Sequence, residues 1–287
     1  MYNKKFYTEA LLLTRSYYPE ELQSWIVWYF EILKIDHVVL FDNDSPIDIS
    51  SIIRPYEDRI EYYTIHGWPN QHKLYTDYQK DSKAQWTIAI DDDEYLYLSD
   101  KYKYSINEFV SYMDTKYQKN MIYPLWLNLL SKESLASHND LYFNTHTYFS
   151  YRAYNKIKMR YSNGNMYGKC FTNNNYSYDY VNRNYGCHHI PKCLDGSDEA
   201  IVPDGIATKT DRVYRPGYIP DCFIAHYQFK TRADWIRKCN NHLVISGKCT
   251  LSGSKDVYDL LYSYNDLFTQ CTLVKDLWCM YNTNHKI

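Results

Sequence analysis

The sequence lacks the features that would place it in several large classes of protein. No apolar run approaches the roughly 20 residues that a helix needs to cross a bilayer, and the run at 11–13 is too short for a secretory signal. The 32 Lys and Arg residues nearly balance the 34 Asp and Glu residues, for a net charge of -2. This balance argues against a surface that binds nucleic acid or an anionic membrane. We therefore expect a soluble, cytoplasmic protein with no transmembrane segment.

The positions of cysteine and glycine also argue against disulfides, a structural zinc site and a glycine-rich phosphate loop. None of the eight cysteines precedes Cys170, and without an export signal we expect reduced thiols. Cys187 and Cys193 flank two histidines but lack the Cys-x-x-Cys spacing of structural zinc sites. The stretch 14–19 contains no glycine, so it is not the glycine-rich phosphate loop expected of a sugar nucleotidyltransferase.

Strand-like and helix-like segments alternate along the chain. We expect strands at 8–14, 37–41, 59–65, 86–90, 121–130 and 222–227, and helices from Pro19 and at 70–83, 105–115, 231–244 and 256–281. Ser105 and Glu108 have the spacing of a capping box. The polar segment 131–165 is expected to be a loop-rich insertion. The alternation predicts an α/β protein with a mostly parallel sheet and ligands at the carboxyl ends of its strands.

Four consecutive acids, Asp91 to Glu94, follow the predicted strand 86–90. Adjacent negative charges at a strand end call for protonation, solvation or a bound cation. Asp91 and Asp93 leave the same face of an extended chain and can converge on one ion. Carboxylate oxygens suit Mg²⁺ or Mn²⁺, which can bridge a diphosphate, whereas the glycine and glutamate spacing of an EF-hand is missing. The alternative interpretation is a solvated acidic turn.

The order of several motifs resembles that of the family 92-like and related family 2-like glycosyltransferases. The motifs are Trp25, Asp42-Asn43-x-Ser45, Gln71 with Tyr75, Trp86 through Asp91-Asp92-Asp93-Glu94, Lys169, His189-Ile190-Pro191, and His226-Tyr227 with Lys230 and Lys238. Thr14-Arg15-Ser16 departs from the Lys-Asn-Glu-type triplet of many relatives. The likeness runs from about Leu12 to about Lys238.

This resemblance implies a GT-A fold. It is an α/β architecture with a Rossmann-like, mostly parallel central sheet flanked by helices, in which a nucleotide half joins an acceptor half. We accordingly expect one large domain at 1–245, with a nucleotide-binding half at 1–120 and an acceptor half at 121–245. A C-terminal helical extension is expected at 246–287.

The resemblance also implies which residues bind the nucleotide. Asp42 is expected to meet the uracil or ribose, because a carboxylate accepts from an imide N–H or a hydroxyl; its alternative role is an Asx-turn acid. Thr14 is a further nucleotide candidate or a plain turn residue. Asp92 is the additional acid between Asp91 and Asp93, and we expect it either to help bind the nucleotide sugar or to be merely exposed. Lys230 could neutralise the diphosphate as a point charge, unless it is only solvated.

The expected metal ligands are Asp91, Asp93 and His226, with Asp91 contacting either the ion and its water or the ribose. A histidine among carboxylates favours Mn²⁺ over Mg²⁺. Glu94 is expected to anchor the turn through hydrogen bonds. His189 is placed near the donor or acceptor sugar, or in a structural role. Asp195 is the candidate catalytic base if the reaction inverts the anomeric carbon.

Together these expectations describe a metal-dependent glycosyltransferase that moves a hexose from a nucleotide sugar to a hydroxyl group. The expected donor is a UDP-hexose and the expected acceptor a glycan or glycoconjugate. The 34 tyrosines suit contacts with sugar faces. Two alternatives stay open: a catalytically inactive GT-A-like protein that binds glycans or serves as a scaffold, and a sugar nucleotidyltransferase. The sugar, the acceptor and the stereochemistry are left open by the sequence.

Overall fold

The chain divides into two compact units, which are described separately. The first comprises Met1–Leu125, Tyr167–Asp204 and Asp221–Ile224, and the second Trp126–Met166, Gly205–Pro220 and Ala225–Ile287. The predicted domain boundaries at 120 and 245 stay a prediction. The computed structural model describes residues 5–67, 70–136, 141–150, 167–176, 178–179, 192–193, 200–203, 206–207, 212–213, 219–246 and 257–285.

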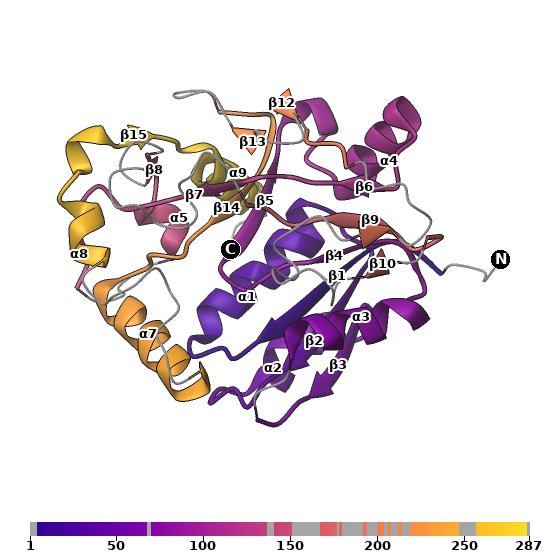
Figure 1. Ribbon diagram of the computed structural model, residues 1–287, viewed down its shortest axis with the longest axis horizontal. Coiled ribbons are helices and arrows are strands. Elements are labelled where there is room, and N and C mark those ends of the chain that lie inside the picture. Colours follow the sequence, from indigo (N-terminus) through magenta and orange to yellow (C-terminus); the bar gives the residue numbers. More distant parts are fainter. Residues whose placement is uncertain are drawn as a thin grey trace. The chain divides into compact units, whose positions relative to one another are not determined.

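The first unit is built on a six-stranded sheet with the order β3-β2-β1-β4-β9-β6 (Figure 1). Its strands are β1 (Phe6–Thr14), β2 (His37–Asp42), β3 (Ile60–Thr64), β4 (Ala84–Ala89), β6 (Met121–Ile122) and β9 (Phe171–Asn173). The strands β1 to β4 are mutually parallel, whereas β9 pairs antiparallel with both β4 and β6. The predicted α/β class with a mostly parallel central sheet is therefore confirmed.

Register fixes which strand ends lie next to each other. Thr14, the last residue of β1, pairs with Asp42, the last residue of β2. On the other side of β1, Leu11 pairs with Ala89 of β4, and the Ile90 N–H donates to the Leu11 carbonyl at 3.0 Å. Because parallel strands end at one edge, the residues that follow β1, β2 and β4 meet there.

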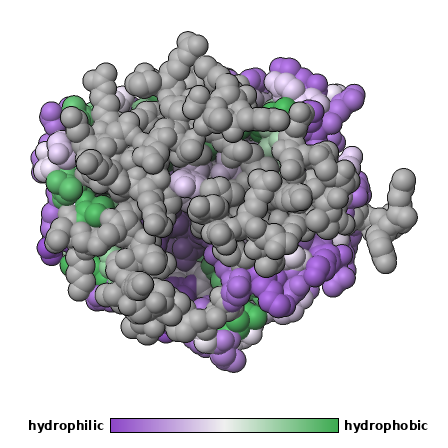
Figure 2. Space-filling view, in the orientation of Figure 1, coloured by the Kyte–Doolittle hydropathy of each residue, from purple (hydrophilic) through white to green (hydrophobic). Residues whose placement is uncertain are grey.

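Helices cover both faces of this sheet. Helix α3 (Gln71–Asp81) places Tyr75 in a buried cluster with Leu11, Val39 and Phe41. Its outer side is hydrophilic, as Figure 2 shows over the region of α3. On the opposite face, α4 (Ile106–Tyr117) reaches β1 through a side-chain hydrogen bond between Thr8 and Asn107. The Asn70 side chain caps α3 by accepting from the Lys73 N–H at 3.1 Å.

The start of α4 follows only half of its predicted pattern. Ser105 caps the helix by accepting from the Glu108 N–H at 3.4 Å. The Glu108 carboxylate lies instead 3.0 Å from the Lys103 ammonium, an exposed pair. The helix from Pro19 is α1 (Pro19–Val27), which continues as a π-helical turn, Trp28–Ile32.

Further short elements complete the first unit. They are α2 (Ile49–Ile53), the 3-10 turns Arg54–Tyr56 and Asp100–Tyr102, β5 (Glu94–Leu98), β10 (Tyr178–Asp179) and β11 (Lys192–Cys193). Strand β14 (Cys222–His226) begins in this unit and ends in the second.

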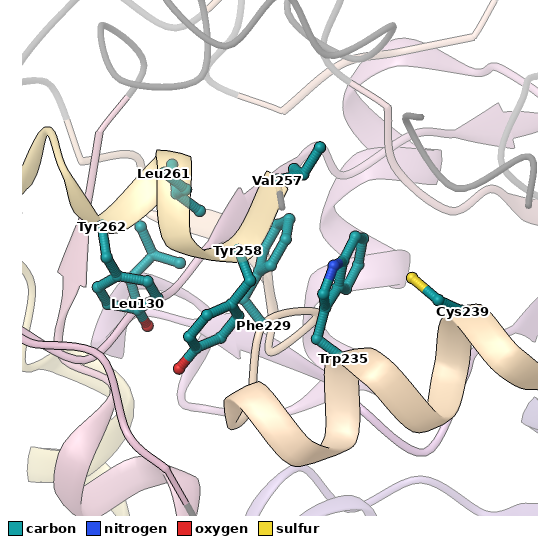
Figure 3. Close-up of a cluster of buried hydrophobic side chains, with 8 residues drawn as sticks. All are labelled: Leu130, Phe229, Trp235, Cys239, Val257, Tyr258, Leu261 and Tyr262. Atoms are coloured by element: carbon teal, nitrogen blue, oxygen red, sulfur yellow. The ribbon is translucent and has the colours of Figure 1, made fainter. Parts of the chain in front are cut away.

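The second unit has its own hydrophobic core (Figure 3). Its elements are β7 (Trp126–Asn128), α5 (Tyr142–Thr145), β8 (Tyr148–Phe149), β12 (Ile206–Ala207), β13 (Arg212–Val213), α7 (Arg232–Ser246), α8 (Val257–Tyr262), the 3-10 turn Asn265–Leu267, β15 (Thr269–Gln270) and α9 (Leu273–His285). Trp235 and Cys239 of α7 pack with Tyr258 and Leu261 of α8, and Phe229 joins them. Helices α7 and α8 are thus held by aromatic side chains.

Two predicted elements are wrong in their extent. The strand expected at 121–130 is divided into β6 and β7, because Pro124 between them has no N–H to donate to a ladder. The helix expected at 256–281 is divided into α8 and α9. Phe268 is extended between them, and β15 pairs antiparallel with β8. Strand pairing across the second unit overrides the helical pattern of the sequence.

No helix among the described residues is both long enough and apolar enough to span a bilayer.

Cysteine reactivity offers a direct test of the burial in the second unit. Cys279 is exposed, whereas Cys271 is buried and its burial raises the pKa of the thiol to about 11. Because the thiolate is the nucleophile, we expect iodoacetamide at pH 8 to alkylate Cys279 well before Cys271. Peptide mapping by mass spectrometry checks the order, and denaturant should abolish it. Equal rates in the folded protein would contradict the packing described here.

Candidate functional site

The strand order of the first unit predicts where a ligand can bind. Strands β2 and β3 follow β1 in turn on one side of it, whereas β4 lies on its other side. The strand order therefore reverses between β1 and β4. In open α/β sheets, ligands bind outside the carboxyl ends of the strands at such a reversal. Thr14 is the last residue of β1 at this edge, and the acidic run Asp91–Glu94 comes after β4.

The four acids form a tight turn that leads from β4 into β5. The Glu94 N–H donates to the Asp91 carbonyl at 3.1 Å, and the Asp91 N–H donates to the Glu94 side chain at 2.9 Å. The Trp25 indole N–H donates to the same Asp91 carbonyl at 3.1 Å. Glu94 is fully buried and holds the turn, the role predicted for it from the sequence.

A cation of the chain itself lies against this turn. The Lys169 ammonium is 2.7 Å from one oxygen of Asp91 and 3.3 Å from Glu94, and the Lys169 side chain is fully buried. The other Asp91 oxygen accepts from the Gln71 side chain at 3.0 Å. Burial raises the pKa of Glu94 to about 8, while the charge of Lys169 acts in the opposite direction. Part of the negative charge of the acidic run is thus neutralised inside the protein.

The two middle acids of the turn differ in their surroundings. The Thr14 hydroxyl donates to the Asp92 carboxylate at 2.5 Å, so Asp92 fastens the turn to the end of β1. Asp93 is buried to 7% exposure. The Asn43 N–H donates to the Thr14 carbonyl at 2.8 Å, which draws the loop after β2 to the same edge. The structure therefore brings Thr14, Asp92 and the loop after β2 together.

Asp42 sits at the end of β2 in a buried position. One carboxylate oxygen accepts from the Ser45 N–H at 3.0 Å, and the other accepts from the Tyr62 hydroxyl at 3.0 Å. The first bond is the turn-capping contact of the alternative role; the nucleotide contact stays a prediction. The neighbouring Asn43 side-chain oxygen is buried and has no hydrogen-bond partner. A buried acceptor of this kind is costly unless a ligand or water supplies a donor.

The remaining predicted residues lie in the second unit or outside the described residues. In the second unit, the His226 ring is buried with its centroid 4.3 Å from that of Trp126. The Lys230 ammonium lies 4.4 Å from the centre of the Tyr142 ring. His189 and Asp195 lie outside the described residues. The roles predicted for these four residues stay predictions.

Gln71, Tyr75 and Lys169 are residues of the sequence motifs for which the sequence predicts no role. The structure gives all three a place around Asp91. The Tyr75 hydroxyl accepts from the Leu13 N–H at 2.9 Å and from the Gln71 side chain at 3.2 Å. The signal that could have found Lys169 is the unbalanced charge of the acidic run, which needs a cation from the chain or from solution.

Gly168 allows Lys169 to approach the turn. A Cβ at position 168 would lie 2.0 Å from the Pro124 carbonyl oxygen, and the Gly168 N–H donates to the Tyr123 hydroxyl at 2.9 Å.

We expect Gly168→Ala to lower the free energy of unfolding by about 1–3 kcal/mol, as overpacking typically does. Chemical denaturation measures this. The Gly67→Ala control adds a Cβ that meets nothing within 4 Å, so it tests only the backbone angle there.

A divalent cation is compatible with the acids of this edge. Among the described residues, no group of three or more His, Cys, Asp or Glu side chains is arranged to hold a metal ion. An ion that bridges a diphosphate needs fewer protein ligands, since one or two carboxylates, phosphate oxygens and water complete its coordination. Asp93 and Asp91 are the candidate carboxylates in the first unit, and the role of each with an ion stays a prediction.

The protein is thus an α/β protein in which polar side chains gather at the carboxyl ends of the parallel strands. No protein-family model and no curated protein matches the chain. TarS 1–349 from S. aureus is similar to it at 9% identity, over 89% of this chain and 69% of that chain, with a TM-score of 0.38.

Two further solved structures show likeness of the same order. For TarS 1–349 in complex with UDP, the identity is 11% over 50% of this chain and 41% of that chain, with a TM-score of 0.31. For the 4-diphosphocytidyl-2C-methyl-D-erythritol synthase from Anaerococcus prevotii, it is 12% over 59% and 71%, with a TM-score of 0.33. Likeness at this level assigns no family, and the fold class rests on the chain's own sheet.

Proposed function

We propose that the protein is a GT-A-like glycosyltransferase that moves a hexose from a UDP-sugar to a hydroxyl group of a glycan or glycoconjugate. The observation that carries the proposal is the convergence of Thr14, Asp42 and the Asp91–Glu94 turn at the reversal point of the sheet. A nucleotide bound there would meet buried acceptors at the end of β2 and acids at the end of β4.

The end of β2 supplies the groups for the nucleoside. The Asp42 carboxylate can accept further hydrogen bonds, because each of its oxygens has two lone pairs. The buried Asn43 side-chain oxygen is a second acceptor beside it. A uracil imide and the ribose hydroxyls are donors that suit such groups. Thr14 holds the loop and the acidic turn in place through its carbonyl and its hydroxyl.

With the nucleoside at the end of β2, the diphosphate of the donor would lie against the acidic turn. Asp93 is proposed to ligate Mn²⁺ or Mg²⁺, and Asp91 to contact the ribose or the water around the ion. A bound divalent ion would stabilise the negative charge that develops on the departing diphosphate. The residues of this chain contribute by keeping the turn rigid: Glu94 and Trp25 bind the backbone of Asp91.

Calorimetric titration of UDP with and without Mn²⁺ tests the proposal. We expect binding that depends on Mn²⁺, and release of UDP from one member of a panel of nucleotide sugars. Absence of UDP binding in the presence of Mn²⁺ would refute the proposal. Formation of pyrophosphate from a nucleoside triphosphate and a sugar phosphate would instead identify a sugar nucleotidyltransferase, which could use the same edge.

A further inference from the structure

The burial of the Lys169 side chain is unusual for a lysine. This side chain is fully buried, although lysine is almost never fully buried unless it is paired. Its ammonium lies 2.7 Å from Asp91 and 3.3 Å from Glu94. The Gln71 side chain, 3.0 Å from the second Asp91 oxygen, fixes the carboxylate from the other side. The Asp91 carboxylate is therefore held by two partners from distant parts of the chain.

This arrangement limits how a metal ion can use the turn. An ion bound directly to the Asp91 oxygen that faces Lys169 would lie close to the buried ammonium, and like charges at such a distance repel each other, even though the Asp91 side chain is 24% exposed. The ammonium also reduces the negative charge that would attract a free ion to the turn.

We propose that Lys169 is a positioning residue that serves as an internal counter-ion of Asp91, so that the divalent ion binds firmly only together with the diphosphate. The inference rests on the proposed function. It assigns Asp91 to the support of the turn, while Asp93 keeps the role of metal ligand proposed above. The diphosphate supplies the charge and the oxygen ligands that the turn alone lacks.

Binding of Mn²⁺, followed by electron paramagnetic resonance of the free ion with and without UDP, tests the proposal. For the wild type we expect weak binding of Mn²⁺ alone and stronger binding with UDP. Lys169→Met should bind Mn²⁺ alone about tenfold more tightly, the effect of one positive charge removed from the neighbourhood of a divalent ion. Lys169→Arg, which keeps the charge, should bind Mn²⁺ as the wild type does.

Lys73→Met is the matched control, because Lys73 is exposed on α3 and its loss changes the net charge equally. It should leave Mn²⁺ binding unchanged. Weaker or unchanged Mn²⁺ binding by a folded Lys169→Met protein would overturn the inference, since a merely structural defect weakens binding. Wild-type protein that binds no Mn²⁺ even with UDP would remove the proposed function, and the inference with it.

A double variant keeps the inference testable if Lys169→Met does not fold. Asp91→Asn with Lys169→Met removes both charges of the Asp91–Lys169 pair, so that Asp91 is not left without its counter-ion; Glu94, the other partner of Lys169, is unchanged. We expect this protein to bind Mn²⁺ alone within about threefold of the wild type, because the charge of Asp91 and the charge that offsets it are removed together; tenfold would represent 1.4 kcal/mol. A larger loss of affinity would show that Asp91 ligates the ion directly and would overturn the inference.

Discussion

Lys169→Met is expected to lower the free energy of unfolding by about 3 kcal/mol, the lower end of the usual cost of removing one partner of a buried ion pair, because Lys169 is fully buried but Asp91 is partly exposed. The substitution keeps the length of the side chain but leaves the Asp91 carboxylate, 2.7 Å from the lost ammonium, without its cation. Glu94 is affected less, because burial already raises its pKa to about 8 and favours its neutral form near pH 7. Urea denaturation followed by circular dichroism measures the change.

The double variant described above separates charge from packing in this result. With Asp91→Asn added, the unpaired charge is gone, and we expect most of the lost stability to return. Double-mutant cycles of interacting pairs show coupling of this kind. A double variant as unstable as Lys169→Met alone would mean that the lysine contributes through packing of its aliphatic chain. Lys73→Met, on the exposed side of α3, should change stability by less than about 0.5 kcal/mol.

Asp93→Asn is expected to reduce turnover of the UDP-sugar by about a hundredfold or more while the protein stays folded. The estimate follows from the several kcal/mol that a bound cation contributes at a leaving group and the factor of ten in rate for each 1.4 kcal/mol. Asparagine keeps the shape of the side chain but loses the charge that would ligate the ion. Release of UDP under saturating donor measures the rate.

Asp81→Asn provides the control for this experiment. Asp81 ends α3 in an exposed position, so the same chemical change there should leave the rate unaltered. If Asp93→Asn retains the wild-type rate, Asp93 does not ligate an ion that takes part in the reaction. If both proteins and the wild type are inactive with every donor, a binding or scaffold role becomes the better interpretation.

The parallel core of the first unit could be predicted from sequence because its signals are local. Strand β1 has a nearly continuous buried run, and β2 is buried throughout. Such runs, separated by a helical periodicity, leave few arrangements other than a parallel sheet. Once the sheet is parallel, Thr14, Asp42 and Asp91 are expected at one edge, and the registers between β1, β2 and β4 confirm this.

The remaining features depend on contacts between residues far apart in sequence. The break between α8 and α9 contains no proline or glycine; it is set by the pairing of β15 with β8. The partner of Asp91 could not be derived from spacing, since 78 residues separate Asp91 from Lys169. The acidic run predicts a metal ion from its charge alone and does not show that a lysine of the chain neutralises part of that charge.

The position of β9 between β4 and β6 has a consequence for how the protein is made. A ribosome delivers β4, the acidic turn and β6 long before it delivers Lys169 and Phe171–Asn173. Until that segment emerges, the strand that joins β4 to β6 is missing and the Lys169 ammonium is not beside Asp91. We therefore expect the first unit to complete its sheet only after residues 126–166, which belong to the second unit, have been synthesised.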